Sequence, residues 1–89
     1  MQPLQRVTAP TLDVLTTLLE SSAPAFGLDI MKRTGRPSGT IYPILERLER
    51  QGWITSTWEE HTTTQLHRRR VYEFTPEGRE AAAALVQNR

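Results

Sequence analysis

The sequence of 89 residues contains no cysteine and no long apolar run, and its five glycines and six prolines are spread along the chain. The lack of cysteine excludes a disulfide framework and a cysteine-based zinc site, and it is compatible with a reducing cytoplasm. No apolar run approaches the roughly 20 residues that span a bilayer, and residues 1–9 carry no apolar signal core. We therefore expect one small cytoplasmic domain without disulfides and without a membrane partner.

The sequence also has almost no net charge, since 11 Lys and Arg residues are balanced by 10 Asp and Glu residues. Overall charge therefore indicates nothing about nucleic acid, whereas the placement of the basic residues does. Lys32, Arg33 and Arg36 form one basic cluster and residues 68–70 form another, while most acidic residues lie elsewhere. Two local clusters are typical of a protein that contacts phosphates at chosen points, although two ordinary solvated surfaces would give the same pattern.

Two helices are predicted in the first part of the chain. Thr8 is placed to cap the first helix, with Pro10 in its first turn. A second, shorter helix is predicted over residues 26–34, where Gly35 would provide a left-handed C-terminal cap. The apolar members are Leu12, Leu15, Leu18 and Leu19 in the first helix, and Leu28, Ile30 and Met31 in the second.

A third helix is predicted from residue 37 or 38 to residue 51, with Gly52 ending it. Its apolar positions follow the 0, 3, 4, 7 spacing of an amphipathic helix and are Ile41, Ile44, Leu45 and Leu48. Pro43 would remove one internal hydrogen bond, so we expect a later start near Gly39 or a slight kink.

After Gly52 the apolar period changes to two, which predicts a β-hairpin. Residues 60–66 between its strands are polar and lack Gly and Pro, so we expect a long loop instead of a two-residue turn. A last helix follows, with Thr75 as its N-cap and Pro76 at its first position. The predicted strands cover residues 53–59, with Ile54, Ser56 and Trp58 on one face, and residues 67–75, with Tyr72 and Phe74 on one face.

The order of helix, helix, helix, hairpin and helix predicts a winged helix-turn-helix of α+β, mostly α class, with residues 1–7 as an N-terminal arm. The second and third helices are joined at residues 35–37, which is the spacing of a helix-turn-helix. Such a motif places the N-terminal end of its second helix in the major groove of double-stranded DNA. The candidate DNA-binding residues are Lys32, Arg36, Ser38, Gly39, Thr40, Tyr42, Pro43, Arg47, Arg68, Arg69 and Arg70.

The candidates divide by the part of DNA that each would contact. Ser38, Thr40 and Arg36 would read base edges, while the other basic residues would contact phosphates. Tyr42 is offset from the apolar stripe, which favours phosphate contact over a place at the edge of the core. Residues 68–70 would bring the wing to the DNA backbone or the minor groove, although at most two of three successive strand residues point the same way. A charged edge strand that resists aggregation is the alternative.

Two segments resemble the PadR-like family of transcriptional regulators. Residues 39–54 are similar to the family's Gly-Thr-aliphatic-Tyr-Pro-x-Leu stretch, its Arg-Leu-Glu segment and the Gly and aliphatic residue that follow. Residues 68–79 are similar to its wing strand, with basic residues, a Tyr and the Thr-x-x-Gly that opens the next helix. The resemblance covers roughly residues 8–80. It implies a repressor that binds operator DNA as a homodimer, with Tyr42 at the DNA-facing start of the recognition helix.

The resemblance also implies a dimer interface, which in this chain would involve the first and last helices. Members of the family usually add more helix, and many bind small aromatic effectors there, whereas this sequence ends at Arg89; we therefore do not expect a large effector pocket. In the alternative interpretation the same residues cover the core of their own domain. The candidate interface residues are Leu12, Leu15, Leu19, Ala82, Leu85 and Val86.

The remaining residues of chemical interest favour structural roles. Trp53 is expected to fill the core, and packing is also favoured for Trp58 over stacking on an aromatic ligand. His61 and His67 lack a third metal ligand, and the threonines at 62–64 lack a base, so we predict no metal, no cofactor and no enzymatic activity. The sequence thus predicts a sequence-specific repressor that binds a pseudo-palindromic operator. A winged helix that holds another protein without binding DNA is the alternative.

Overall fold

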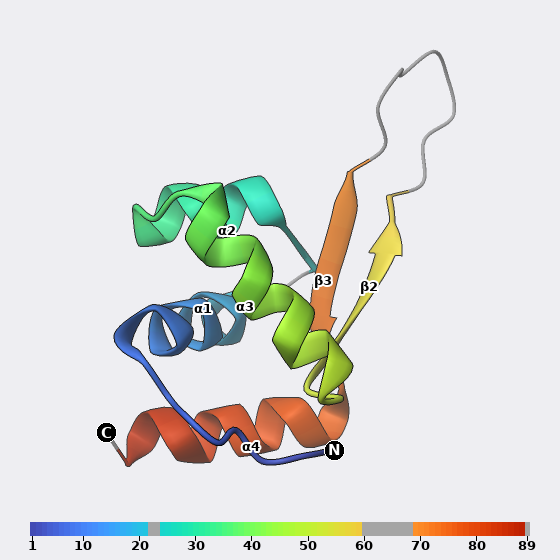
Figure 1. Cartoon of the computed structure of the whole chain (residues 1–89). Helices are drawn as coiled ribbons and strands as arrows, with labels where there is room; N and C mark the ends of the chain where they lie inside the picture. Colours follow the sequence, from blue (N-terminus) through green and yellow to red (C-terminus); the bar gives the residue numbers. More distant parts are fainter. Residues whose placement is uncertain (22–23, 60–68, 89) are drawn as a thin grey trace.

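The computed structural model describes residues 1–21, 24–59 and 69–88, which form four helices and a three-stranded antiparallel sheet (Figure 1). The order confirms the predicted winged helix-turn-helix of mostly helical α+β class, in which β2 and β3 form the wing. Among the helices described, none combines the length and the apolar character that a membrane span requires. The elements are α1 (Ala9–Glu20), β1 (Ala25–Phe26), α2 (Gly27–Thr34), α3 (Ser38–Arg50), β2 (Ile54–Trp58), β3 (Arg70–Phe74) and α4 (Pro76–Gln87).

Helix α1 begins where the sequence predicts it but buries a different face. The Thr8 hydroxyl caps the helix by accepting the N–H of Thr11 at 3.3 Å. Leu12 and Leu19, which were predicted to be buried, lie at the edge of the buried face and stay partly exposed. The buried face of α1 includes two threonines, which the spacing of the leucines does not indicate. Its buried residues are Thr11, Val14, Leu15, Thr17 and Leu18.

The turn between α2 and α3 contains the predicted left-handed glycine. Gly35 has a φ of 71°, and its N–H donates to the Met31 carbonyl at 2.9 Å, which closes α2. Helix α3 starts at Ser38, within the predicted start at residue 37 or 38 and not later near Gly39, so Pro43 lies inside the helix. Because proline lacks an N–H, the Gly39 carbonyl has no helical donor four residues further on.

The core lies between α1, α3 and the sheet. All four predicted apolar positions of α3 are buried, and Trp53 is only 4% exposed, which confirms its predicted place in the core. Leu28 was predicted to be an apolar member of the buried face of α2 but is 46% exposed. It precedes the buried Ile30 by two residues, which puts the two side chains on opposite sides of a helix. The largest fully buried side chains are Val14, Leu15, Ile30, Ile41, Leu45, Leu48 and Ile54.

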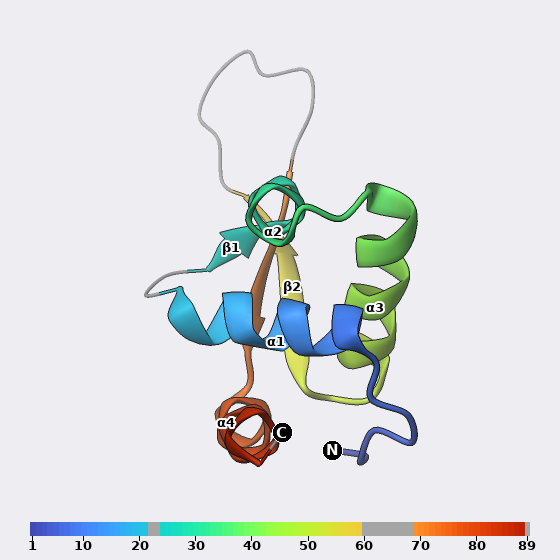
Figure 2. The same ribbon diagram turned by 90° about the vertical axis from the view of Figure 1, so that its left-hand side faces the viewer.

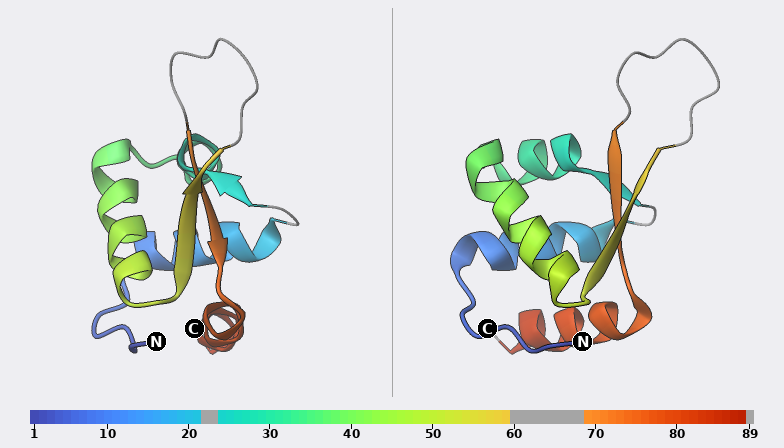
Figure 3. Two further views of the ribbon diagram at one scale, coloured as in Figure 1. Left: turned by 90° about the vertical axis from the view of Figure 1, so that its right-hand side faces the viewer. Right: turned by 45° about the vertical axis from the view of Figure 1, so that its right-hand side comes forward.

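The sheet has one strand more than the predicted hairpin. The short strand β1 pairs with β3 on the side away from β2, giving the order β1-β3-β2 (Figure 3). In the wing, Ile54 lies opposite Phe74, Ser56 opposite Tyr72 and Trp58 opposite Arg70. Side chains that face each other across this register point to the same side of the sheet. We call the side that carries Ile54, Ser56, Trp58, Arg70, Tyr72 and Phe74 the inner face.

Helix α4 lies across the end of the molecule opposite the wing, and the N-terminal segment runs beside it (Figure 1). Thr75 is its N-cap, as predicted, and accepts the N–H of Gly78 at 2.9 Å. The N-terminal segment is held by two hydrogen bonds: the N–H of Gln2 donates to the Gln51 carbonyl at 2.9 Å, and the indole N–H of Trp53 donates to the Gln2 carbonyl at 2.6 Å.

Candidate nucleic-acid interface

The leading end of α3 is directed toward the same end of the molecule as the wing (Figures 1 and 2). Burial of its apolar stripe leaves one side of the helix facing solvent, as the sequence predicts. The first turn carries short polar groups and N–H groups without helical acceptors, which suits contact with phosphates and base edges. The exposed residues on this side are Ser38, Gly39, Tyr42, Pro43, Glu46, Arg47 and Arg50, while Thr40 is partly buried. Arg50 pairs with Glu46 at 3.4 Å, one turn earlier on the same helix.

Tyr42 is 43% exposed, and its ring lies against the first residue of α2. A Cβ atom added at Gly27 would lie 2.6 Å from the Tyr42 hydroxyl oxygen, a distance that no side-chain Cβ tolerates. Gly27 therefore allows the ring to lie between α2 and the solvent-facing side of α3. This role of Gly27 depends on a contact with a residue 15 positions away along the chain, which no local sequence pattern indicates.

Arg36, predicted to read base edges, is bound to Asp13 in α1. Its Nη2 atom lies 2.8 Å from Asp13 Oδ2, and its Nε–H donates to the same oxygen at 2.9 Å. This ion pair ties the helix-turn-helix turn to α1, so the side chain has a structural partner that the sequence did not indicate. Lys32 lies exposed near the end of α2 and forms no ion pair with the residues described.

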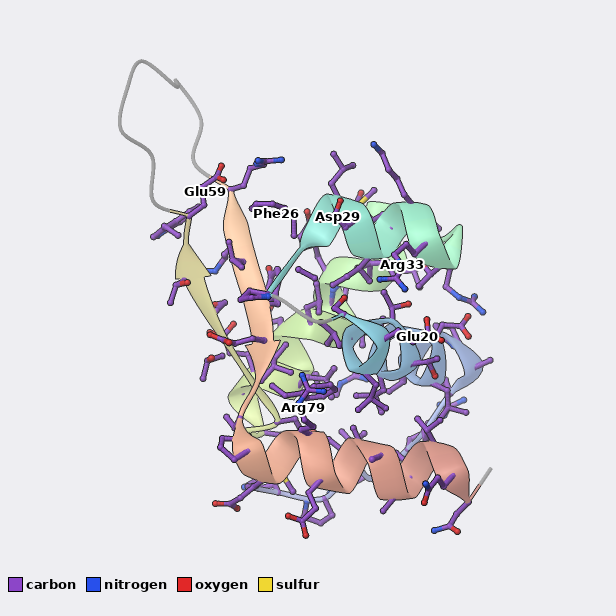
Figure 4. All side chains as sticks on the ribbon, turned by 180° about the vertical axis from the view of Figure 1, so that it is seen from behind. Glu20, Phe26, Asp29, Arg33, Glu59 and Arg79 are labelled. Atoms are coloured by element: carbon purple, nitrogen blue, oxygen red, sulfur yellow. The ribbon has the colours of Figure 1, made fainter. Side chains whose placement is uncertain are left out.

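Arg33, the remaining member of the first basic cluster, points away from the leading end of α3. Its guanidinium lies 3.1 Å from Glu20 and donates to the Ser21 hydroxyl at 3.3 Å. Figure 4 shows Arg33 and Glu20 close together on the side of the molecule behind that of Figure 1. The sequence analysis did not propose Arg33 as a DNA contact, and its pairing agrees with that choice.

The wing arginines differ in their surroundings, and Arg68 lies outside the described residues. Arg69 is held by Glu59, whose carboxylate accepts its Nε–H at 2.9 Å, and its guanidinium lies 3.9 Å from the centre of the Phe26 ring. The hydrogen bond to Glu59 raises the pKa of Arg69 further above its already high ordinary value. Figure 4 shows Phe26 and Glu59 near the upper end of β3. Arg69 therefore belongs to a neutralised pair that packs on an aromatic ring.

Arg70, in contrast, lies on the inner face of the sheet. Its guanidinium carbon lies 4.7 Å from the centre of the Trp58 ring, and its Nε–H donates to the Ser56 hydroxyl at 3.0 Å. No carboxylate forms an ion pair with Arg70 among the residues that the structure describes. The alternation expected for successive strand residues is thus observed, and only one of these two arginines lies on the α3 side with an unpaired positive charge.

Ser56 connects this arginine to α3. The Ser56 hydroxyl donates to the Glu49 carboxylate at 2.7 Å and accepts from Arg70, which has no acceptor of its own. Period-two alternation in the sequence placed Ser56 and Trp58 on one face, but it indicated neither the register with Arg70 nor the contact with Glu49. These residues were therefore missed as members of the interface.

The Tyr72 hydroxyl lies in the same region of the inner face. Burial raises the pKa of Tyr72, Tyr42 and Glu49 raise it further, and Arg70 lowers it. The net shift is upward, so Tyr72 is neutral at physiological pH. The inner face beside α3 therefore holds the charged Arg70 next to the neutral phenol of Tyr72.

The residues described include no group of three or more side chains suited to hold a metal ion. His61, His67 and the threonines at 62–64 lie outside the described residues, as does the whole predicted wing loop, residues 60–66. Nothing in the geometry that is described brings together a nucleophile, a base and an oxyanion site.

The opposite end of the molecule carries an apolar groove of about 500 Å³ between the N-terminal segment and α4. Two residues predicted to form a dimer interface, Leu15 and Ala82, are instead fully buried in the core of the chain, because α1 and α4 pack on each other there. Leu12, Leu19, Leu85 and Val86 keep part of their surface exposed. The groove is lined by Met1, Pro3, Leu4, Val7, Trp53, Ala81, Ala84, Leu85 and Asn88.

Comparison with known proteins places this architecture among bacterial regulators. The family described as "Transcriptional regulator PadR-like family" matches residues 14–84. The solved structure of a PadR-like transcription factor from Bacteroides fragilis is 29% identical, with a TM-score of 0.67 over 86% of this chain and 78% of that chain. The comparison with curated proteins finds no match.

More distant structures share the fold alone. The protein smu.1704 from Streptococcus mutans UA159 is 24% identical, with a TM-score of 0.72 over 96% of this chain and 82% of that one. MepR from S. aureus, solved in a DNA-binding conformation, is 23% identical, with a TM-score of 0.71 over 91% of this chain and 57% of that one.

Proposed function

The chain belongs to the PadR-like family of transcriptional regulators, and from this premise we propose that it represses transcription by binding operator DNA as a homodimer. A family of regulators agrees with the expectation that the chain is not an enzyme. The observation that carries the DNA-binding proposal is the exposed leading end of α3 beside a wing whose inner face bears the unpaired charge of Arg70. We place this activity in the cytoplasm, where a bacterial regulator meets the genome.

In the proposed complex α3 enters the major groove with its first turn toward the bases. Ser38 and Thr40 read base edges, and Gly39 lets the backbone come close to the DNA. Lys32, Arg47 and Arg70 contact phosphates, and Tyr42 and Pro43 lie against the backbone next to them. Arg36 and Arg69 support the interface through Asp13 and Glu59 instead of contacting DNA directly.

The proposed dimer uses the end of the molecule opposite the wing. Leu85 and Val86 of α4 keep exposed surface beside the apolar groove, while Leu12 and Leu19 keep exposed surface on α1. Two copies joined there would hold two recognition helices about 34 Å apart, one turn of DNA. A two-fold dimer of this kind reads a pseudo-palindromic operator, and occupation of that site would block transcription sterically.

Selection of bound duplexes from a random pool tests the proposal. We expect enrichment of an inverted repeat, and we expect the affinity for the selected duplex to fall steeply with salt. Three phosphate contacts per protomer, at about −0.9 each, predict a slope of log K against log salt of about −5 for a dimer. Failure to enrich any sequence would contradict the proposal, and weak salt dependence would favour a protein partner instead of DNA.

Two variants distinguish the effect of basic residues at the proposed DNA interface from the effect of the net charge of the protein. Lys32→Ala combined with Arg47→Ala should weaken binding and reduce the magnitude of the salt slope by nearly two for each protomer. Arg79→Ala removes a positive charge from α4, and its guanidinium lies over the Phe74 ring. It should leave the slope nearly unchanged, and an effect half as large as that of the double variant, which removes twice the charge, would show that only net charge matters.

A further inference from the structure

The exposed indole of Trp58 is an unusual feature of the wing. It is 50% exposed, whereas the other tryptophan, Trp53, is 4% exposed in the core. Trp58 lies on the inner face, opposite Arg70 in the register of the two strands, and the Arg70 guanidinium lies over its ring at 4.7 Å. The exposed ring thus provides the Arg70 guanidinium with a cation–π contact.

Hydrogen bonds fix the same guanidinium from a second direction. Arginine can only donate, so the Ser56 hydroxyl accepts from Arg70 Nε at 3.0 Å, and its single proton is left for the Glu49 carboxylate at 2.7 Å. The order Glu49, Ser56, Arg70, Trp58 forms a continuous chain of contacts from α3 to the wing. No described residue accepts a hydrogen bond from the two terminal nitrogens of Arg70, so they can donate to another group.

We infer that Trp58, Ser56 and Glu49 are positioning residues that hold Arg70 ready to contact a DNA phosphate beside the groove that α3 enters. The inference rests on the proposed DNA binding and names residues of β2 and of the C-terminal end of α3 that contribute to it without contacting DNA. An arginine held on a ring and by a hydrogen bond loses less side-chain freedom on binding than a free one. Arg69 is not used in this way, because Glu59 already neutralises it.

Glu49 is the one acidic residue in the chain of contacts that leads to Arg70. Glu49 lies near the C-terminal end of α3, beside the wing and away from the end proposed to enter the groove. Its contact with Ser56 explains that position, since it orients the hydroxyl that receives the Arg70 Nε–H. The carboxylate thus acts on Arg70 through Ser56, without lying at the DNA-facing end of α3.

A double-mutant cycle on the duplex selected above tests the inference. Arg70→Ala should weaken binding and reduce the magnitude of the salt slope by about 0.9 per protomer. Ser56→Ala changes no charge and should weaken binding about fivefold at nearly constant slope, because the arginine still reaches the phosphate but from many rotamers. In the Arg70→Ala background, Ser56→Ala should have no further effect.

Matched variants exclude a general effect on the strand. Thr57→Ala removes a hydroxyl from the neighbouring exposed position on the other face of β2 and should leave affinity unchanged. Ser56→Thr keeps the hydroxyl and should restore binding. The inference would be overturned if Ser56→Ala and Thr57→Ala lowered DNA affinity equally. It would also be overturned if Ser56→Ala lowered DNA affinity as much without Arg70 as with it.

Tryptophan fluorescence gives a second readout. Because Trp53 is buried, acrylamide should quench mainly Trp58, and bound DNA should protect it. In the free protein, the Arg70 Nε–H should exchange slowly with water, and Ser56→Ala should remove that protection. The inference alone is overturned if the wild-type protein binds DNA but acrylamide quenches Trp58 equally in the free and the bound protein. It is also overturned if the Arg70 Nε–H of the free wild-type protein exchanges rapidly with water. A wild-type protein that binds no duplex even at low salt overturns the proposed function as well.

Discussion

At the scale of single residues, the contact between Gly27 and Tyr42 shows how a small residue can set the position of a large one. Tyr42 lies on the solvent-facing side of α3, and only the missing side chain of Gly27 lets its ring lie so close to α2. A residue of α2 therefore determines the position of Tyr42, a proposed DNA contact on α3.

Gly27→Ala should displace the Tyr42 ring and weaken DNA binding severalfold. Overpacking of this kind typically also costs about 1–3 kcal/mol of unfolding free energy. Denaturant unfolding and DNA affinity measure the two effects. The control is the same change in a Tyr42→Ala background, where the overlap is gone and alanine should stabilise the first turn of α2 by about 0.5–1 kcal/mol. An equal cost in both backgrounds would contradict the steric argument.

Tyr72 gives a pH-dependent prediction at the same scale. Its pKa is raised in the folded protein, chiefly by burial, so the folded state holds its proton more tightly than the unfolded state does. This contribution to stability is complete below the ordinary tyrosine pKa of about 10 and is lost as the pH rises through the folded value. Denaturant unfolding above pH about 10 should therefore show a steeper loss of stability in the wild type than in Tyr72→Phe. Parallel curves would contradict the assignment.

Some of these residues could be read from the sequence and others could not, for a physical reason. The caps at Thr8, Gly35 and Thr75 depend on atoms within four residues along the chain, so local rules predict them. The partners of Arg36 and Arg69 lie 23 and 10 residues away, and their pairing depends on how the elements pack. Sequence reasoning therefore found the basic side chains but not which of them are already neutralised.

At the scale of elements, the junction between the wing and α4 depends on one threonine. The Thr75 hydroxyl accepts the N–H of Gly78 at 2.9 Å and lies 3.1 Å and 3.2 Å from the carbonyl oxygens of Gly52 and Trp53. A Cβ at Gly78 would overlap the Trp53 carbonyl oxygen, so α4 starts directly against the strand that follows α3. One side chain thus joins the helix cap to the base of the wing.

Thr75→Ala should lower the free energy of unfolding by about 1–2 kcal/mol, since it removes an N-cap and a hydrogen bond to a partly buried carbonyl. Thr75→Ser keeps the hydroxyl and should recover most of this loss. Chemical denaturation of both variants measures the difference. If serine and alanine destabilise equally, the methyl group of Thr75, and not its hydroxyl, provides the stability.

The sheet marks the limit of sequence reasoning about elements. The wing strands were predicted because their apolar side chains alternate, and β2 and β3 follow that pattern. Strand β1 has only two residues, Ala25 and Phe26, which is too short for any period to be seen. It exists because β3 offers an unpaired edge to the segment that enters α2. A prediction of such a strand requires the tertiary arrangement that it belongs to.

At the scale of the whole molecule, the two proposed binding surfaces lie at opposite ends (Figure 1). The leading end of α3 and the wing are directed to one end, while α4 and the apolar groove form the other. A partner chain on the groove would therefore leave the DNA-binding end free. The near-neutral charge of the chain, +1, is consistent with this division, since salt dependence would come from a few basic residues at one end.

Ala84→Lys tests whether that second end joins two copies of the chain. Ala84 is exposed on α4 and lines the groove, so a lysine there adds a charge to the proposed interface without disturbing the core. Sedimentation should show the wild type as a dimer and the variant shifted toward monomer. Loss of the dimer should weaken binding to a full inverted repeat by about 100-fold or more, while affinity for a single half-site stays the same. Gln87→Lys, an exposed change on the same helix outside the groove, should leave the protein dimeric, and a dimeric Ala84→Lys protein would place the interface elsewhere.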